Sequence, residues 1–236
     1  MLDAITSTQI ALLQDQYRLQ SISQDISNMQ TPGYKKQFVT AVAFDELVSV
    51  NAMAVNQQLR LDQSNVQGTF NQSNRPTDLA LAGDGYFEVQ TSEGIYYTRR
   101  GDFIVNSHGE LATATGAVLL GKGGAIRVDD NQFTIDSQGT VIIDSQKVEQ
   151  LNLVKFNGPK QLDYQGEGLF AANQSPLADS STRVLQGYLE QSNIKSSDAM
   201  LEMVQTARHF ESAQRVMRTA DSLLATGINQ LGEGNV

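Results

Sequence analysis

The stretch Ile26-Ser27-Asn28-Met29-Gln30-Thr31-Pro32-Gly33-Tyr34-Lys35 decides the fold, because it ends a long helical segment and begins a region without helical periodicity. The residue before a proline is pushed out of the α region and glycine accepts a positive φ, so Thr31-Pro32-Gly33 stops a helix. Its counterpart, Gly187-Tyr188-Leu189-Glu190-Gln191-Ser192-Asn193-Ile194, precedes a helical C-terminal segment. Helices at both ends suit a subunit that polymerises through its ends.

Residues 3 to about 30 contain no glycine or proline and carry an apolar side chain at every seventh position. The repeat consists of Ile5, Leu12, Leu19 and Ile26, with Ile22 and Met29 on the same side. A strict seven-residue repeat keeps one stripe facing a partner helix, as in a coiled coil. The stripe is thin, because Thr8 and Asp15 occupy the complementary positions. An amphipathic helix packed on its own domain is the alternative for this segment.

Residues from about 195 to 231 predict a longer helix, with Ser196, Ser197 and Asp198 as favourable caps at its start. An apolar residue again recurs every seven positions, at Met203, Phe210, Met217, Leu224 and Leu231. Small residues follow three positions later, at Ala213, Ala220 and Gly227. Large side chains beside small ones allow two helices to approach closely. Neither helix can bury its stripe alone, so we expect the two to pair.

The region from about 76 to 185 alternates short β-branched and aromatic runs with glycine turns, which predicts an all-β domain rather than βαβ units. Residues 103–111 and 133–141 repeat one pattern, a strand, an Asx-Ser-x-Gly turn and a second strand. We therefore expect two hairpins of one design. The stretch 36–75 is rich in Gln, Asn and Ser, has weak periodicity and is interpreted as an extended connector.

The predicted fold class is therefore α+β, with paired terminal helices forming a coiled-coil-like unit and a central all-β domain of hairpins. The expected segments are an N-terminal helical segment at 1–35, the connector at 36–75, the β-domain at 76–186 and a C-terminal helical segment at 187–236.

Composition excludes several classes of function. The chain has 236 residues and a formal net charge of −9, which leaves no positive footprint for nucleic acid or an anionic membrane. It has no cysteine, so it forms no disulfide and no thiolate metal site. No run of about 18 apolar residues occurs, so we expect no membrane insertion. The first residues lack the charged and apolar regions of a cleaved secretory signal.

Candidates for chemistry are few. His108 and His209 each lack a second imidazole at ligand spacing, so we expect turn or surface positions for both. Gly121-Lys122-Gly123-Gly124 lacks the full phosphate-loop spacing and is interpreted as a turn. The Arg99-Arg100 pair is accounted for by a hairpin with an Arg-Gly-Asp turn. We therefore expect no enzyme activity, no cofactor and no metal.

Four blocks, in order, resemble the bacterial flagellar rod and hook (axial) proteins over essentially the whole chain. They are Asn28 with Thr31-Pro32-Gly33-Tyr34-Lys35, then 75–87, then 97–103, and finally 187–194 followed by Met203 and Arg208-His209-Phe210-Glu211. One block departs from the family, since Ser23-Gln24-Asp25-Ile26-Ser27-Asn28 stands where Ala-Asn-Asn-Leu-Ala-Asn is usual. Chain length, the short connection from Tyr34 to Arg75 and the stretch 199–210 look most like the proximal-rod members, with distal-rod and hook-type members as near relatives.

The resemblance implies a structural subunit of the flagellar basal body, which spans the cell envelope. Such proteins are exported unfolded by the flagellar type III apparatus without a cleaved signal. Their terminal helices pair and stack with other rod and hook proteins into an inner tube that transmits torque, and the β-domain forms an outer layer. The assembly residues expected here are Asn28, Tyr34, Asn193 and the two apolar stripes. A secreted β-rich binding module and a cell-wall enzyme are the alternatives.

Overall fold

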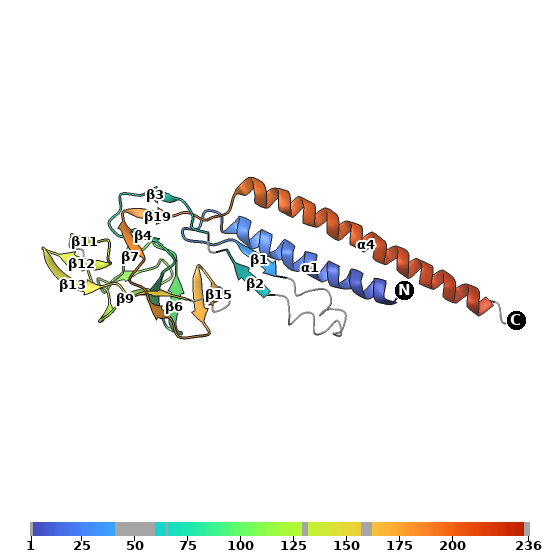
Figure 1. Ribbon diagram of the computed structural model, residues 1–236, viewed down its shortest axis with the longest axis horizontal. Helices are drawn as coiled ribbons and strands as arrows, with labels where there is room; N and C mark the ends of the chain where they lie inside the picture. The colour runs from blue at the N-terminus through green and yellow to red at the C-terminus, as the bar shows by residue number, and fades with distance from the viewer. Residues whose placement is uncertain (1, 41–59, 65, 129–131, 157–161, 234–236) are drawn as a thin grey trace. The chain divides into compact units, whose positions relative to one another are not determined.

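The computed structural model describes residues 2–40, 60–64, 66–128, 132–156 and 162–233 (Figure 1). The chain forms two compact units. The helical unit comprises Met1–Ser27, Gln37–Asp62 and Ile194–Val236, and the β-unit comprises Asn28–Lys36 and Gln63–Asn193. Much of the connector predicted over 36–75 falls in 41–59, outside the described residues. Both ends of the chain therefore belong to one unit.

The helical unit is built on α1 (Leu2–Ser27) and α4 (Ser196–Glu233), which lie side by side (Figure 1). They run antiparallel, because Arg18 of α1 meets Glu202 while Asp15, earlier in α1, meets His209, later in α4. The predicted pairing of the terminal helices is confirmed. With 26 residues in α1 and 38 in α4, a rise of about 1.5 Å per residue makes α4 the longer helix by roughly 18 Å.

A two-stranded sheet of β1 (Gln37–Thr40) and β2 (Arg60–Gln63) covers a second side of α1. The amide of Gln37 donates to Asp25 Oδ1 at 3.1 Å, and Ser21 Oγ donates to the carbonyl of Gln37 at 3.2 Å. Asp25 and Ser21 are both buried as a result. Asp25 is one of the residues at which the chain departs from the family pattern, and here it holds β1 on the helix.

Within its described residues, the β-unit contains a ten-stranded sheet and three smaller antiparallel sheets. The main path of the large sheet is β15 (Leu162–Gly166), β16 (Leu169–Ala172), β6 (Gly94–Thr98), β5 (Tyr86–Thr91), β9 (Val118–Gly121), β8 (Leu111–Ala112) and β7 (Ile104–Val105). Off this path, β10 (Gly124–Ala125) pairs with β9, while β14 (Leu153–Lys155) pairs with β5 and with β17 (Leu177–Ala178). The smaller sheets are β11 (Phe133–Ile135) with β12 (Thr140–Ile143) and β13 (Gln146–Gln150), β4 (Leu79–Ala82) with β18 (Arg183–Gln186), and β3 (Phe70–Gln72) with β19 (Tyr188–Glu190).

The core of the β-unit forms where inward-facing strand residues meet. Its fully buried members include Leu79, Phe87, Phe103, Leu111, Leu119, Ile126 and Val141. Phe87 and Phe103 pack edge to face with ring centroids 5.4 Å apart. Burying one such side chain stabilises a fold by about 1.5–3 kcal/mol, so each of these residues contributes to the stability of the unit. The α+β prediction is confirmed.

The two predicted hairpins, β7–β8 and β11–β12, share one turn geometry. In each, the first turn residue accepts backbone N–H bonds from the residues two and four positions later, at 2.9 and 2.9 Å for Asn106 and at 2.9 and 2.8 Å for Asp136. Gly109 and Gly139 then take φ of 75° and 80°. The positive φ explains why both turns carry glycine at that position. The prediction of one hairpin design is confirmed.

Candidate functional site

A buried ion cluster in the β-unit joins the segment that follows α1 to strand β19. Lys35 Nζ donates to Glu190 Oε1 and to the carbonyl of Val66, the latter at 3.1 Å. On the other side of the same carboxylate, Arg99 Nη1 lies 3.5 Å from Glu190 Oε2. Lys35 is 3% exposed, Arg99 4% and Glu190 2%. Two cations therefore share one carboxylate away from water, and we call these three residues the ion cluster.

Arg99 is held by groups other than the carboxylate. Its Nη2 donates to the carbonyl of Gly83 at 2.6 Å, and its guanidinium lies 5.0 Å from the ring centroid of Tyr86. A cation over an aromatic face gains about 0.5–2 kcal/mol, more when water is excluded. Burial also raises the pKa of Tyr86. The ring therefore stays neutral beside the guanidinium and serves as a packing surface for it.

Burial lowers the pKa of Lys35, because the ammonium loses its water, and the carboxylate of Glu190 offsets that loss only in part. The charge of Arg99 lowers this pKa further. Glu190 is therefore the main group that favours the ionised form of Lys35. Glu190 also accepts a hydrogen bond from the amide of Gly68 at 2.9 Å, so one carboxylate organises three segments of the chain.

Gly33 brings the backbone of the helix-stop motif against the same region. Its amide donates to the carbonyl of Glu190 at 2.7 Å, and its φ is 69°. A Cβ on this residue would lie 2.3 Å from the carbonyl oxygen of Arg99, well inside contact distance. Glycine is required here both by the backbone conformation and by the space.

Three assembly residues predicted from the sequence lie in this part of the β-unit. Asn193 Oδ1 accepts from the amide of Lys36 at 2.7 Å, and its Nδ2 donates to the carbonyl of Val66 at 2.9 Å. Tyr34 is 2% exposed and its ring stands edge-on to Tyr164 at 6.1 Å between centroids. Asn28 accepts a hydrogen bond from Thr31 Oγ1 at 3.2 Å, which fixes the end of the helix. In the structure all three make contacts within their own chain.

The predicted stripes lie in the helical unit. Ile5, Leu12, Leu19, Ile26, Phe210 and Met217 are half-buried, Met203 is 39% exposed and Leu224 38% exposed. The side chain of Leu231 lies outside the described residues. Asp15, which interrupts the stripe of α1, is 6% exposed and pairs with His209 of α4. A polar pair therefore fills the position at which the apolar repeat fails.

Sequence reasoning missed the ion cluster. Lys35 was part of the helix-stop motif, Glu190 part of the C-terminal block and Arg99 part of a hairpin turn. A usable signal is the glycine near each of them in sequence, namely Gly33, Gly187 and Gly101. Glycine often marks a close backbone approach, and a charged residue beside such an approach is a candidate for burial.

Metal-ligand clusters and membrane-spanning helices are both absent from the part of the chain that the structure describes. Among them, no group of three or more His, Cys, Asp or Glu side chains is arranged to hold a metal ion. None of the described helices combines the length and the apolar character needed to cross a membrane. The predicted turn at Lys122-Gly123 is confirmed between β9 and β10.

Two segments of the chain match known families. Residues 80–143 match the flagellar hook protein FlgE/F/G D1 domain, and residues 185–231 match the flagellar basal body rod FlgEFG protein C-terminal family. The flagellar basal-body rod protein FlgG of Bacillus subtilis is 32% identical over 91% of this chain and 93% of its own length. The rod protein FlgF of Salmonella typhimurium is 31% identical over 84% of this chain and 85% of its own length. FlgF of Mesorhizobium japonicum is 28% identical over 96% of this chain and 95% of its own length.

Proposed function

The chain belongs to the flagellar basal-body rod protein family, and we propose that within this family it is the proximal-rod subunit FlgF. As a family member it is a structural protein of the flagellar basal body, not an enzyme, and it assembles with other axial components. The finer choice is supported by alignment length. The FlgF of Mesorhizobium japonicum aligns with 96% of the chain over 235 residues, whereas the FlgG of Bacillus subtilis aligns with 91% over 253. The alignment with FlgG therefore contains many more gaps opposite this chain than the alignment with FlgF does.

The observation that carries the assembly mechanism is the unequal length of α1 and α4. The antiparallel pairing sets the end of α1 near the start of α4, so the excess lies at the C-terminal end of α4. Leu224 is already 38% exposed there, and the apolar repeat continues to Leu231 in the sequence. A stripe without a partner in its own chain is covered when another subunit packs on it.

Many weak contacts of this kind add up in a head-to-tail lattice that does not close, and such a lattice transmits torque along the rod. In this proposal the terminal segments 1–35 and 187–236 mediate assembly, and the β-domain at 76–186 lies outside them. The stripes contact neighbours directly, while Asn28, Tyr34 and Asn193 fix the segments that lead into the helices. In this proposal the flagellar type III apparatus exports the chain before it folds.

Deletion of the gene in its native cell tests the function. We expect isolated basal bodies, imaged by electron microscopy, to show membrane rings without a completed rod and hook, and a plasmid copy to restore both. Complete basal bodies with normal hooks would remove the rod assignment. The position is tested on the same particles with antibodies to the other rod proteins. A proximal subunit predicts that the distal-rod protein FlgG is missing from them, and its retention would contradict the FlgF assignment.

A further inference from the structure

We infer that two surfaces of the helical unit are complementary and dock on each other in successive copies of this chain. One is a groove between α1 and α4, here called the acidic groove. The other lies on the side of α4 that faces away from α1, here called the basic face. This inference rests on the proposed function as an assembling subunit, and it names the partner of the helical unit as a second copy of the chain.

The acidic groove has a volume of about 690 Å³. Its lining residues are Gln14, Asp15, Arg18, Asp198, Leu201, Glu202, Gln205, Thr206 and His209. Three carboxylates stand against one guanidinium, so the groove is net acidic. Glu202 lies 3.8 Å from Arg18 and Asp15 is paired with His209, which leaves Asp198 as the exposed carboxylate outside these pairs. Leu201, 59% exposed, lines the outer edge of the groove and lies seven residues before Arg208, so it borders the basic face.

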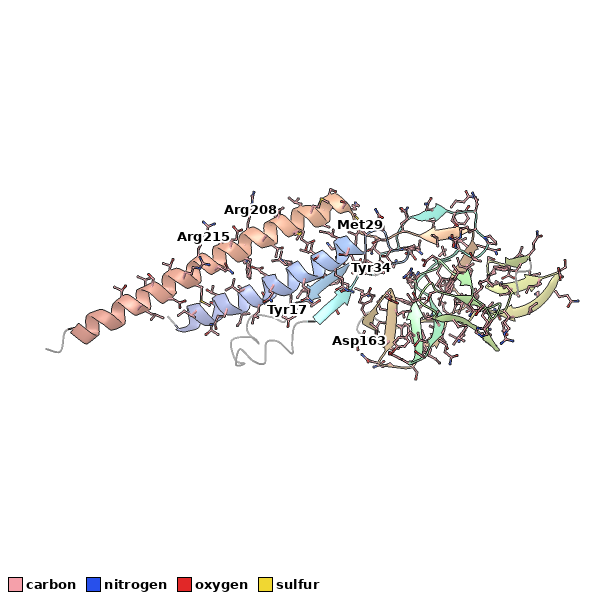
Figure 2. The ribbon with its side chains drawn as sticks, turned by 180° about the vertical axis from the view of Figure 1, so that it is seen from behind. Tyr17, Met29, Tyr34, Asp163, Arg208 and Arg215 are labelled. Carbon is pink, nitrogen blue, oxygen red and sulfur yellow. The ribbon has the colours of Figure 1, made fainter. Side chains whose placement is uncertain are left out.

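The basic face is formed by Arg208, Arg215 and Arg218, all exposed. Spacings of seven and three residues put these side chains on one side of a helix. Figure 2 shows Arg208 and Arg215 pointing away from α1. Among the described residues, two exposed carboxylates accompany these three arginines: Glu211, 66% exposed and 3.9 Å from Arg215, and Asp221, three residues after Arg218, so the face is net basic. Met200 and Val204, 54% and 49% exposed, extend it with apolar surface towards the start of α4.

The two surfaces cannot meet within one copy, because the residues of both belong to the same helix, α4, and point in different directions from it. Their opposite charge and their exposed apolar side chains make each a partner for the other on a second copy. Such a contact joins different patches of identical subunits, so it repeats from copy to copy and generates a filament when its rotation does not close a ring. Charge pairs at its edge set register and steer association, while the apolar contacts add affinity.

A charge exchange tests this contact in the deletion strain. The first variant carries Arg208→Glu, Arg215→Glu and Arg218→Glu, and the second carries Asp198→Lys and Gln205→Lys, which leave Arg18–Glu202 and Asp15–His209 intact. We expect each variant alone to give at least tenfold fewer completed basal bodies, and the two combined in one chain to restore at least half of them. Arg127→Glu in the β-unit, also exposed, is the control without effect.

A second measurement does not depend on charge. The chain has no cysteine, so Asp198→Cys with Arg215→Cys introduces the only two thiols, one on each surface. With a short bismaleimide, basal bodies built from this double variant should give a ladder of linked multimers, and each single variant should give dimers at most. Normal assembly of both charge variants, failure of the combined variant to restore assembly, or absence of the ladder would each overturn docking between copies. The phenotype of the deletion would still stand and would support the rod function.

Discussion

Lys35 and Glu190 form a buried ion pair although 155 positions separate them in the chain. Lys35 lies just after the helix-stop motif and Glu190 at the end of β19, so the pair fastens together the segments next to the two terminal helices. Arg99, which directly follows β6 of the ten-stranded sheet, is the third member of the ion cluster. Removing one partner from a buried pair leaves an uncompensated charge, which makes this cluster sensitive to substitution.

Glu190→Gln keeps the shape of the side chain but leaves Lys35 and Arg99 buried without an anion. We expect the free energy of unfolding to fall by about 3–5 kcal/mol, measured by urea denaturation of the purified chain. Lys35→Met should lower it less, because Glu190 keeps Arg99 as a partner. Glu110→Gln, which alters the exposed pair with Arg127, is the control and should change little. Equal effects of Glu190→Gln and Glu110→Gln would contradict the account.

The same variant has a pH signature. Burial already lowers the pKa of Lys35, and loss of the carboxylate lowers it further. Between this folded pKa and the unfolded value the unfolded chain binds more protons, so stability rises with pH. Part of the loss in Glu190→Gln should therefore be recovered as the pH is raised from 7 towards 10. A loss that stays constant across this range would show that Lys35 is not the uncompensated charge.

Gly33→Ala places a methyl group against the carbonyl of Arg99 in a left-handed backbone conformation. The conformation alone costs about 1–2 kcal/mol for a residue with a Cβ, and the 2.3 Å contact adds to this. Gly116→Ala is the matched control, because its φ is also positive, at 92°, but its Cβ would meet nothing within 4 Å. Thermal unfolding of the two variants should show the larger loss for Gly33→Ala. The reverse order would sink the close-approach explanation.

Leu224→Asp puts a charge on the apolar stripe of α4, near the level at which α1 begins. We expect swimming zones in soft agar to shrink at least tenfold, because the stripe can no longer be covered by a neighbouring subunit without burying an unpaired carboxylate. Limited proteolysis should still yield an intact β-unit. Ser222→Asp, two residues earlier and exposed, is the control with near-normal swimming. Full motility of Leu224→Asp would reject the stripe as an assembly surface.

Asp136→Asn tests the turn of the second hairpin. The amide of Thr140 donates to the Asp136 carboxylate and lowers its pKa below the ordinary value of 3.8. Ionised Asp136 therefore stabilises the fold above that value, and this contribution is lost as the pH falls through the folded pKa. The asparagine at the matching position, Asn106, makes the same two hydrogen bonds without titrating.

We therefore expect Asp136→Asn to be less stable than the wild type at pH 7, because its bonds are not charge-assisted, and to lose less melting temperature than the wild type between pH 5 and pH 2. Circular dichroism at each pH provides the measurement. A variant that loses as much as the wild type over this range would show that Asp136 takes no part in the acid response.

The elements that sequence predicts well are those set by local rules. Asn106 and Asp136 predict their turns because the hydrogen bonds that they accept come from residues no more than four positions away. The terminal helices are predicted by the seven-residue repeats. The pairing of these helices is also predictable, since neither stripe can be buried alone. The partner of Asp15 is not, because one carboxylate in a thin stripe does not indicate that His209, 194 positions away, lies against it.

The ion cluster depends on contacts that no local rule contains. Arg99 and Arg100 are neighbours in one motif, yet their side chains lie in different environments. Arg100 makes the expected turn contact, with two bonds of 2.8 Å to Asp102, while Arg99 turns into the interior. Which of two adjacent arginines is buried follows from strand alternation and from where β19 arrives, and β19 is fixed only when the whole β-unit has formed.

The separation of Lys35 and Glu190 also has a consequence in time. With 155 positions between them and a synthesis rate of about 5–20 residues per second, Lys35 is made roughly 8–30 s before its partner. Over that interval its ammonium has no carboxylate to bury it, and Gly33 has no carbonyl of Glu190 to bind. The contacts of Lys35 and Gly33 with Glu190 therefore form only after the C-terminal part of the chain has been made, and they come late in the folding of the β-unit.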